Sequence, residues 1–308
     1  MYLRMRVNEG LHMSKAEAAQ AAPCVLSIQS WVAYGHVGNA AAMFPLQRLG
    51  AEVWAIHTVQ FSNHTGYGDW RGQVFDGAAV GALVDGMAAR GALSRCDAVL
   101  SGYMGDMGIG GAILDAVARV RAASPAAVYC CDPVIGDADT GPYVRDGIEA
   151  LLGGAALPAA DLLTPNLFEL ERLAGRPCAT RADITAAVAA VRARMRAAGP
   201  RVVLVTSART EETPADSLDL VVAGPAGTVL IRTPLLDLRA NGAGDVTAAL
   251  FLYHWLATGE ATEAAGRAVA AVHGLLRRTR AAGSAELLVV QAQDEFVSPS
   301  IRFPAVPL

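Results

Sequence analysis

Short apolar runs alternate with helical patterns along most of this 308-residue chain, and this alternation constrains the fold more than any other feature of the sequence. Because a helix that connects two strands normally leaves them parallel, the pattern predicts an α/β fold with a mostly parallel central sheet and helices on both faces. The expected strands are 25–28, 53–58, 97–100, 127–131, 161–163 and 202–205. The expected helices between them are 38–49, 78–90, 110–122, 166–174 and 182–197.

The C-terminal third departs from this alternation. Residues 218–222 and 228–232 flank a Gly-Pro-Ala-Gly turn and are expected to form a small antiparallel hairpin at one edge of the sheet. Two further helices, 246–256 and 262–280, complete the fold. Because no repeat, linker or change of composition divides the chain, residues 23–308 are expected to form a single domain. Residues 1–22 are expected to be a disordered N-terminal tail or a start-site extension.

Composition excludes several classes of function. A net charge of −4 and the lack of a long basic run argue against a nucleic-acid partner. Five cysteines without zinc-type spacing are typical of reduced thiols in a cytoplasmic protein. No apolar run reaches the length of a membrane span, and the N-terminus lacks the pattern of a signal peptide. We therefore expect a cytoplasmic protein that binds small molecules and no membrane.

The strongest local signal is the sequence Gly242-Ala243-Gly244-Asp245, directly before an apolar helix. The two glycines let the backbone approach a ligand, and the first amides of a helix have no intrahelical acceptor, so an anion can bind there. Asp245 is suited to two roles, a simple helix cap or a base that takes a proton from an attacking hydroxyl. The motif alone does not separate these two roles.

Lysine usage narrows the chemistry, because Lys15 is the only lysine in the chain. A P-loop needs a lysine directly after its glycine-rich loop, and a protein kinase needs one on a strand, so both classes are excluded. A phosphoryl-transfer site in this chain must stabilise charge with backbone amides, a metal ion, or both.

Polar residues follow the expected strands at the edge of the sheet where ligands collect in such folds. Each one alone has an ordinary explanation as a cap or turn residue. Their joint placement at one edge predicts a binding site. The residues are Ser30, Thr58, Tyr103, Asp132, Asp137, Thr164, Asn166, Glu169, Thr206 and Ser207.

Six segments around these residues form a recognisable set: SIQSWVAYGHVGN (27–39), TVQFSNHT (58–65), LSGY (100–103), CDPV (131–134), TPN (164–166) with Glu169, and GAGD (242–245). They resemble pyridoxal kinase, and the resemblance spans about residues 25–293. The Gly-x-Gly-Asp and Asp-Pro-Val motifs are common to the wider ribokinase-like superfamily. The segments at 27–39 and 58–65 are specific to the pyridoxal kinase branch.

The resemblance implies a ribokinase-like three-layer sandwich that uses ATP to phosphorylate the 5′-hydroxyl of pyridoxal, with pyridoxamine and pyridoxine as further acceptors, in vitamin B6 salvage. It implies that Asp245 is the catalytic base. The amides of Gly242, Ala243 and Gly244 would hold the charge of the transferred group. The residues implied to contact ATP are Asp132, Asn166, Glu169, Thr206, Ser207, Gly242 and Gly244.

Metal binding is also implied by the resemblance. Asp132, Asp137 and Glu169 are similar to the acids that hold Mg²⁺, directly or through water, and K⁺ or Na⁺ is implied near Asp132 and Thr164. Hard oxygen ligands suit these ions. Mg²⁺ between the β- and γ-phosphates would replace the missing lysine.

For the vitamin, the resemblance implies that Ser30 and Thr58 contact the ring nitrogen and ring hydroxyl, and that Tyr103 forms an aromatic wall. Cys131 matches a thiol that adds reversibly to the substrate aldehyde in part of the family. The alternative for Cys131 is a structural role as a buried thiol on a strand. Residues 34–38 are either a segment that closes over the substrate or an ordinary loop before a helix.

Two positions depart from the family pattern. Trp31 stands where many members have histidine, and Ala243 stands where some have threonine. Two alternatives stay open, a hydroxymethylpyrimidine or sugar kinase of the same fold and a pyridoxal phosphate carrier with slow turnover. The resemblance also implies a homodimer.

Overall fold

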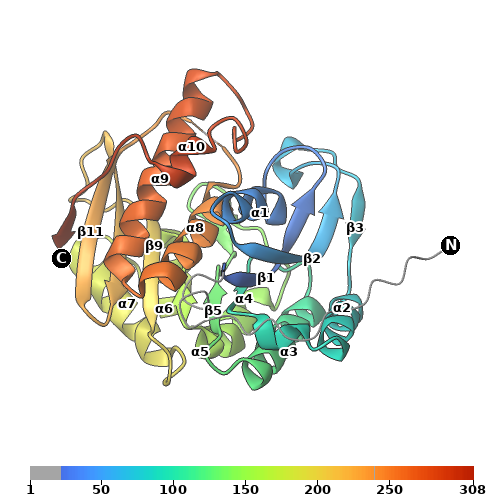
Figure 1. The fold of residues 1–308 in the computed structure, drawn as a ribbon. Helices are drawn as coiled ribbons and strands as arrows, with labels where there is room; N and C mark the ends of the chain where they lie inside the picture. Colours follow the sequence, from blue (N-terminus) through green and yellow to red (C-terminus); the bar gives the residue numbers. More distant parts are fainter. Residues whose placement is uncertain (1–21, 239) are drawn as a thin grey trace, which may run out of the picture.

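The computed structural model describes residues 22–238 and 240–308, and in this part of the chain ten strands form one mixed sheet (Figure 1). The strand order is β12-β11-β10-β9-β8-β5-β4-β1-β2-β3. The pairs from β9 through β8, β5, β4 and β1 to β2 are all parallel. The strands are β1 (Cys24–Val32), β2 (Glu52–Phe61), β3 (Gly72–Val74), β4 (Ala98–Ser101), β5 (Val128–Cys131), β8 (Leu162–Leu163), β9 (Val202–Ala208), β10 (Ser217–Gly224), β11 (Gly227–Pro234) and β12 (Ala305–Pro307).

Helices cover both faces of this sheet (Figure 1). One layer is formed by α1 (Asn39–Arg48), α8 (Ala243–Thr258), α9 (Ala261–Ala281) and α10 (Asp294–Val297). The other is formed by α2 (Gly77–Ala89), α3 (Met107–Ala123), α4 (Ile148–Leu151), α5 (Leu157–Ala159), α6 (Leu167–Ala174) and α7 (Arg181–Arg194). A π-helical turn, Leu152–Ala156, joins α4 to α5.

Adjacent residues of the central strands belong to different cores. Cys130 packs with the α8 and α9 layer, whereas Cys131 packs with the α3 and α6 layer. Leu162 and Leu163 divide in the same way. Because successive side chains of a strand point to opposite faces, a continuous apolar run fills both cores at once. This explains why these strands show no alternation of apolar and polar residues.

The predicted α/β fold and the hairpin, observed as β10 and β11, are confirmed. The structure adds elements that the pattern did not predict. Strands β3 and β12 pair at the two edges of the sheet, the segment 148–159 is helical, and β6 (Gly136–Asp137) pairs with β7 (Gly141–Pro142) in a separate small hairpin. Within the ranges described, no helix is long and apolar enough to span a membrane. The predicted tail lies outside the described residues except for Ala22.

Candidate active site

The site is built around the first turn of α8. Gly242 occupies the N-cap position with a left-handed backbone, φ 90°. A side chain at this position would also collide with the carbonyl oxygen of His36, so glycine is required here for two reasons. Nothing lies near the position that a side chain on Gly244 would occupy, and Gly244 is exposed. The start of α8 therefore has room for a ligand beside Gly244, and the first amides of a helix have no intrahelical acceptor.

Asp245 lies in the same turn but does not cap the helix. The N-cap residue is Gly242, which makes no side-chain hydrogen bond, and Asp245 is the third helical residue. Burial raises the pKa of Asp245 to about 6, against the opposing effect of a hydrogen bond from the backbone amide of Gly38. A carboxylate with this pKa is ionised at neutral pH and is a stronger base than an ordinary aspartate, which suits it to accept a proton.

Asp132 lies at the carboxyl end of β5 and is only 6% exposed. Its Oδ1 accepts a hydrogen bond of 2.8 Å from the hydroxyl of Thr164. Burial raises the pKa of Asp132 well above its ordinary value, and the negative charges of Glu169 and Asp245 raise it further. Because the charge of Asp245 contributes to this shift, the first turn of α8 lies near the acid at the end of β5.

Glu169 is held by backbone amides. It forms a capping box with Asn166, in which Glu169 Oε2 accepts the Asn166 amide at 2.9 Å, and its Oε1 accepts the Ile135 amide at 2.9 Å. Burial nevertheless raises its pKa to about 7. Because both carboxylate oxygens already accept amides, Glu169 contributes negative charge to the site rather than a free metal ligand.

Asp137 shapes the small hairpin beside this cluster. Its Oδ1 accepts hydrogen bonds from the amides of Asp139 and Thr140, at 3.0 and 2.9 Å, and its charge raises the pKa of Glu169. The Asp137 side chain thus stabilises the turn through hydrogen bonds and affects the neighbouring acids through its charge. We define the acid cluster as Asp132, Asp137, Glu169 and Asp245.

Tyr143 is a residue of the site that the sequence analysis missed. It follows β7 and is 51% exposed. Burial of its hydroxyl raises its pKa, and all four carboxylates of the acid cluster raise it further, so the hydroxyl lies within reach of each charge. The only signal in the sequence was its position six residues after Asp137 in a glycine-containing segment. That signal does not distinguish it from an ordinary turn residue.

The predicted nucleotide contacts meet at the ends of β8 and β9. Asn166 and Thr206 form a parallel bridge, and the Thr206 amide donates to the Pro165 carbonyl at 2.8 Å. Ser207 is exposed and has a positive φ of 52°. Such a backbone is uncommon for residues other than glycine and clusters at ligand sites. Its exposure and backbone are compatible with the predicted contact to a ligand, which stays a prediction.

The residues predicted to contact the vitamin lie on β1, on β2 and in the loop after β4. Tyr103 packs against the small apolar cluster of Val32, Val37, Val59 and Phe61. Its carbonyl accepts a 2.9 Å hydrogen bond from the Thr58 hydroxyl. Thr58 is fully buried, so its hydroxyl supports the Tyr103 loop in this structure. Ser30 lies against Gly38, where any side chain would collide with the Ser30 hydroxyl and carbonyl oxygens.

The neighbouring Trp31 packs on the imidazole of His57, with ring centroids 4.8 Å apart. A polar network lies beneath this contact, in which Asn39 Nδ2 donates to the Ile56 carbonyl at 2.9 Å and Ser27 donates to Asn39 Oδ1 at 2.7 Å. The sequence analysis assigned no role to Ser27, Asn39 or His57. The sequence offered one signal for them, namely polar residues within apolar strands and at the start of a helix.

Cys131 is fully buried in the core beneath the site. Burial raises the pKa of its thiol to about 12, with a further contribution from the charge of Asp132. A thiol that is buried and protonated is a poor nucleophile. The structure therefore favours the buried strand thiol over the predicted contact with a substrate aldehyde.

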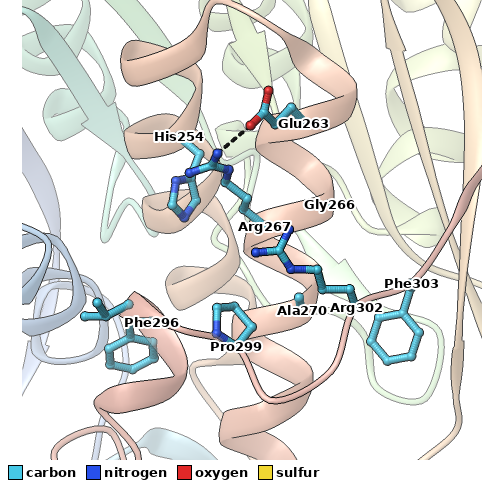
Figure 2. Close-up of a pocket in the computed structure, with 10 residues that line it drawn as sticks. His254, Glu263, Gly266, Arg267, Ala270, Phe296, Pro299, Arg302 and Phe303 are labelled. Carbon is cyan, nitrogen blue, oxygen red and sulfur yellow. Dashed lines mark hydrogen bonds and ion pairs between the residues drawn. The ribbon is translucent and has the colours of Figure 1, made fainter.

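A cavity of about 230 Å³ lies elsewhere, between α8, α9 and the C-terminal segment (Figure 2). It is lined by polar and aromatic side chains that include His254, Arg267, Arg302 and Phe303. None of the residues predicted for the site lines it. This cavity is separate from the cluster of acids and glycines described above.

Comparisons with known proteins agree with this geometry. A family model described as phosphomethylpyrimidine kinase matches residues 95–289. The chain is 60% identical to pyridoxal kinase PdxY of Granulibacter bethesdensis over 91% of this chain and 98% of that protein. It is 52% identical to the pyridoxal kinase PdxY of Deinococcus radiodurans over 91% of this chain and 95% of that protein.

Solved structures give the same result. The fold matches pyridoxal kinase of Leishmania donovani in complex with ADP and ginkgotoxin with a TM-score of 0.84, at 30% identity, over 92% of this chain and 99% of that one. The match to pyridoxal kinase of Trypanosoma brucei has a TM-score of 0.82, at 29% identity, over 94% of this chain and the whole of that one. On its fold, its site and these relatives, the chain belongs to the pyridoxal kinase family.

Proposed function

We propose that this protein transfers the γ-phosphoryl group of ATP to the 5′-hydroxyl of pyridoxal, and of pyridoxamine and pyridoxine, in vitamin B6 salvage. The observation that carries the proposal is the first turn of α8, where an aspartate with a raised pKa stands beside unpaired helix amides and opposite Asp132. The L. donovani structures are complexes with ADP and ginkgotoxin, pyridoxamine or pyridoxine, which supports a nucleotide and a B6 vitamer as the substrates.

In this mechanism the 5′-hydroxyl lies against Asp245, which accepts its proton as the oxygen attacks the γ-phosphorus. The amides at Gly242, Ala243 and Gly244 stabilise the charge on the transferred group. Because they are fixed dipoles of the helix start, they need little reorganisation during transfer. Asn166, Thr206 and Ser207 lie at the neighbouring strand ends and position the nucleotide.

The acid cluster fits a divalent cation such as Mg²⁺. Asp132 and Glu169 are buried, Asp245 is half-buried, and all three have raised pKa values, so a cation would relieve their repulsion. In the described part of the chain, no three His, Cys, Asp or Glu side chains form a preformed metal site. Mg²⁺ commonly binds through one or two carboxylates, water and substrate phosphates, which matches this arrangement. Bound there, it would neutralise charge on the β- and γ-phosphates.

Among the residues of the cluster, Asp132 is the best candidate for a direct ligand, because only one of its oxygens accepts a hydrogen bond, from Thr164. Glu169 and Asp137 would act through charge and ordered water. A K⁺ or Na⁺ ion beside Asp132 and Thr164 remains part of the proposal, since both side chains offer hard oxygen atoms.

A second candidate function is phosphorylation of hydroxymethylpyrimidine, because the matching family model carries that description. The test is an assay of the purified protein with MgATP and equal concentrations of pyridoxal, pyridoxamine, pyridoxine and hydroxymethylpyrimidine. The proposal expects multiple turnovers with pyridoxal and the formation of pyridoxal 5′-phosphate. A preference for hydroxymethylpyrimidine, or less than one turnover per chain with every B6 vitamer, would contradict it.

The carrier alternative depended on an accessible thiol, which the burial of Cys131 does not provide. We also propose a homodimer, on the basis of the family alone. Sedimentation at micromolar concentration tests it, and a protein that sediments only as a monomer would rule it out.

A further inference from the structure

Glu286 lies outside every motif used above, in the loop between α9 and α10, yet it bonds to two distant loops. Its Oε2 accepts a hydrogen bond of 3.3 Å from the backbone amide of His36. Its Oε1 accepts a short hydrogen bond from the hydroxyl of Tyr67. One carboxylate thus joins three segments that are far apart in the sequence.

The local structure is shaped around this carboxylate. Gly35 has a positive φ of 92°, and a side chain on it would collide with the carboxylate of Glu286. The backbone of Glu286 is fixed by Ser284, whose Oγ donates to the Glu286 carbonyl at 2.6 Å. The next residue, Leu287, is buried in the core. The carboxylate is therefore held at a defined position rather than free on the surface.

The two loops that Glu286 holds both reach the first turn of α8. The His36 carbonyl lies against Gly242, where it leaves no room for a side chain, and the Gly38 amide bonds to Asp245. Tyr67 interacts with the side chain of Asn241, which directly precedes Gly242. Any movement of these loops would shift the surroundings of the base and of the phosphate-binding amides.

We propose that Glu286 is a positioning residue that holds residues 35–38 and the 3₁₀ turn Thr65–Tyr67 against the first turn of α8 and the residues just before it. The inference rests on the proposed function. Bonds to an ionised carboxylate are stronger than bonds between neutral groups, so one acid holds both loops with two contacts. A kinase needs this closure, because water that reaches the γ-phosphate competes with the alcohol.

The test measures how ATP is used. The substitutions Glu286→Gln and Tyr67→Phe, alone and together, are assayed for ADP and for pyridoxal phosphate in the same reaction. Each single variant is expected to lower kcat by about tenfold to a hundredfold, because small misplacements near the reacting atoms have effects of this size. Each is also expected to form more ADP than phosphate ester. The double variant should lose less kcat than the product of the two single losses, because both changes break the shared contact between Glu286 and Tyr67, while the contacts with His36 and Asn241 are each affected by one change only.

Glu295→Gln is the matched control. Glu295 is 3% exposed, packs on Gly274 as Glu286 packs on Gly35, and bonds to Arg278 and to the Ser300 amide, away from the site. This change should lower the melting temperature and leave the ratio of ADP to ester at one. A carboxylate with a purely structural role behaves like this control.

The outcomes separate the two proposals. If the wild-type protein makes no phosphate ester, the proposed function fails first. If the wild type couples ADP to ester one to one and both single variants do the same, only the role of Glu286 is overturned. A loss of kcat in the double variant equal to the product of the two single-variant losses would also overturn the role of Glu286. If Glu286→Gln does not fold, Tyr67→Phe decides alone, because Tyr67 is 45% exposed and loses only its hydroxyl.

Discussion

Asp245→Asn should greatly slow phosphoryl transfer and, in the protein without ligands, stabilise the fold. The amide keeps the shape of the side chain and one oxygen that can accept the Gly38 amide, but it cannot take a proton. We expect kcat to fall by about 10²–10⁴-fold, the usual contribution of a general base, with dissociation constants for ATP and pyridoxal within about tenfold of wild type.

The gain in stability follows from the pKa of Asp245. Folding raises this pKa from 3.8 to about 6, so the ionised form is less favourable in the folded protein than in the unfolded chain. The difference corresponds to at most about 3 kcal/mol. Below pH 4 the group is protonated in both states and the penalty vanishes. As the pH rises from about 4 to about 6 the wild type loses this stability relative to Asp245→Asn, and above pH 6 the full difference is present.

The assay is thermal unfolding of both proteins at pH 4 and pH 8 in EDTA without nucleotide. At pH 8 the variant should melt several degrees higher, since about 1 kcal/mol moves the midpoint of a large domain by about 2–4 °C. Adding Mg²⁺ and nucleotide should reduce the difference in melting temperature between the variant and the wild type. The reasoning is refuted if the variant is equally or less stable at pH 8, or if it retains wild-type turnover.

Three further predictions follow from single contacts. Gly242→Ala should lower kcat at least a hundredfold in a steady-state assay. The left-handed φ of this residue is unfavourable for alanine, and the His36 carbonyl leaves no room for a methyl group. A near-normal kcat would contradict this prediction. Glu169→Gln should raise KM for MgATP about tenfold. The NH₂ group of the glutamine would face a backbone N–H donor, and the side chain would lack the negative charge. An unchanged KM would count against a role of the acid cluster in binding MgATP. Asp161→Asn should lower the free energy of unfolding, measured in urea, by about 3 kcal/mol and leave kcat unchanged. It weakens the ion pairs with Arg121 and Arg196 at the amino end of β8, the end of the strand away from the site. A selective loss of kcat would show that Asp161 influences the site.

The arrangement of layers could be predicted from the sequence because it depends on local patterns. Continuous apolar runs such as 202–205 must be buried on both faces, and the helices between them are long enough to connect parallel strands. The edge strands β3 and β12 could not be predicted in this way. Each has three residues, and its pairing depends on a neighbour that is distant or joined by a loop without a turn signature.

The polar residues of the site could be named from the ends of the strands, but their roles needed the tertiary structure. Asp245, Asp132 and Glu169 occur in separate motifs, and their raised pKa values come from burial and from one another's charge. Cys131 is the last residue of the strand that Asp132 follows, yet its side chain is buried in the core. Tyr143 and Glu286 belong to no motif.

The sequence by itself determined the α/β fold, the placement of the predicted site residues at the carboxyl ends of the strands and the glycine turn at 242–245, because hydrophobic periodicity, glycine and helix starts act locally. Only the tertiary structure decided which side chains share a charge environment, which are buried, and which loop contacts the turn. Electrostatic coupling and burial depend on distance in space, and residues such as His36, Gly242 and Glu286 become neighbours only when the chain has folded.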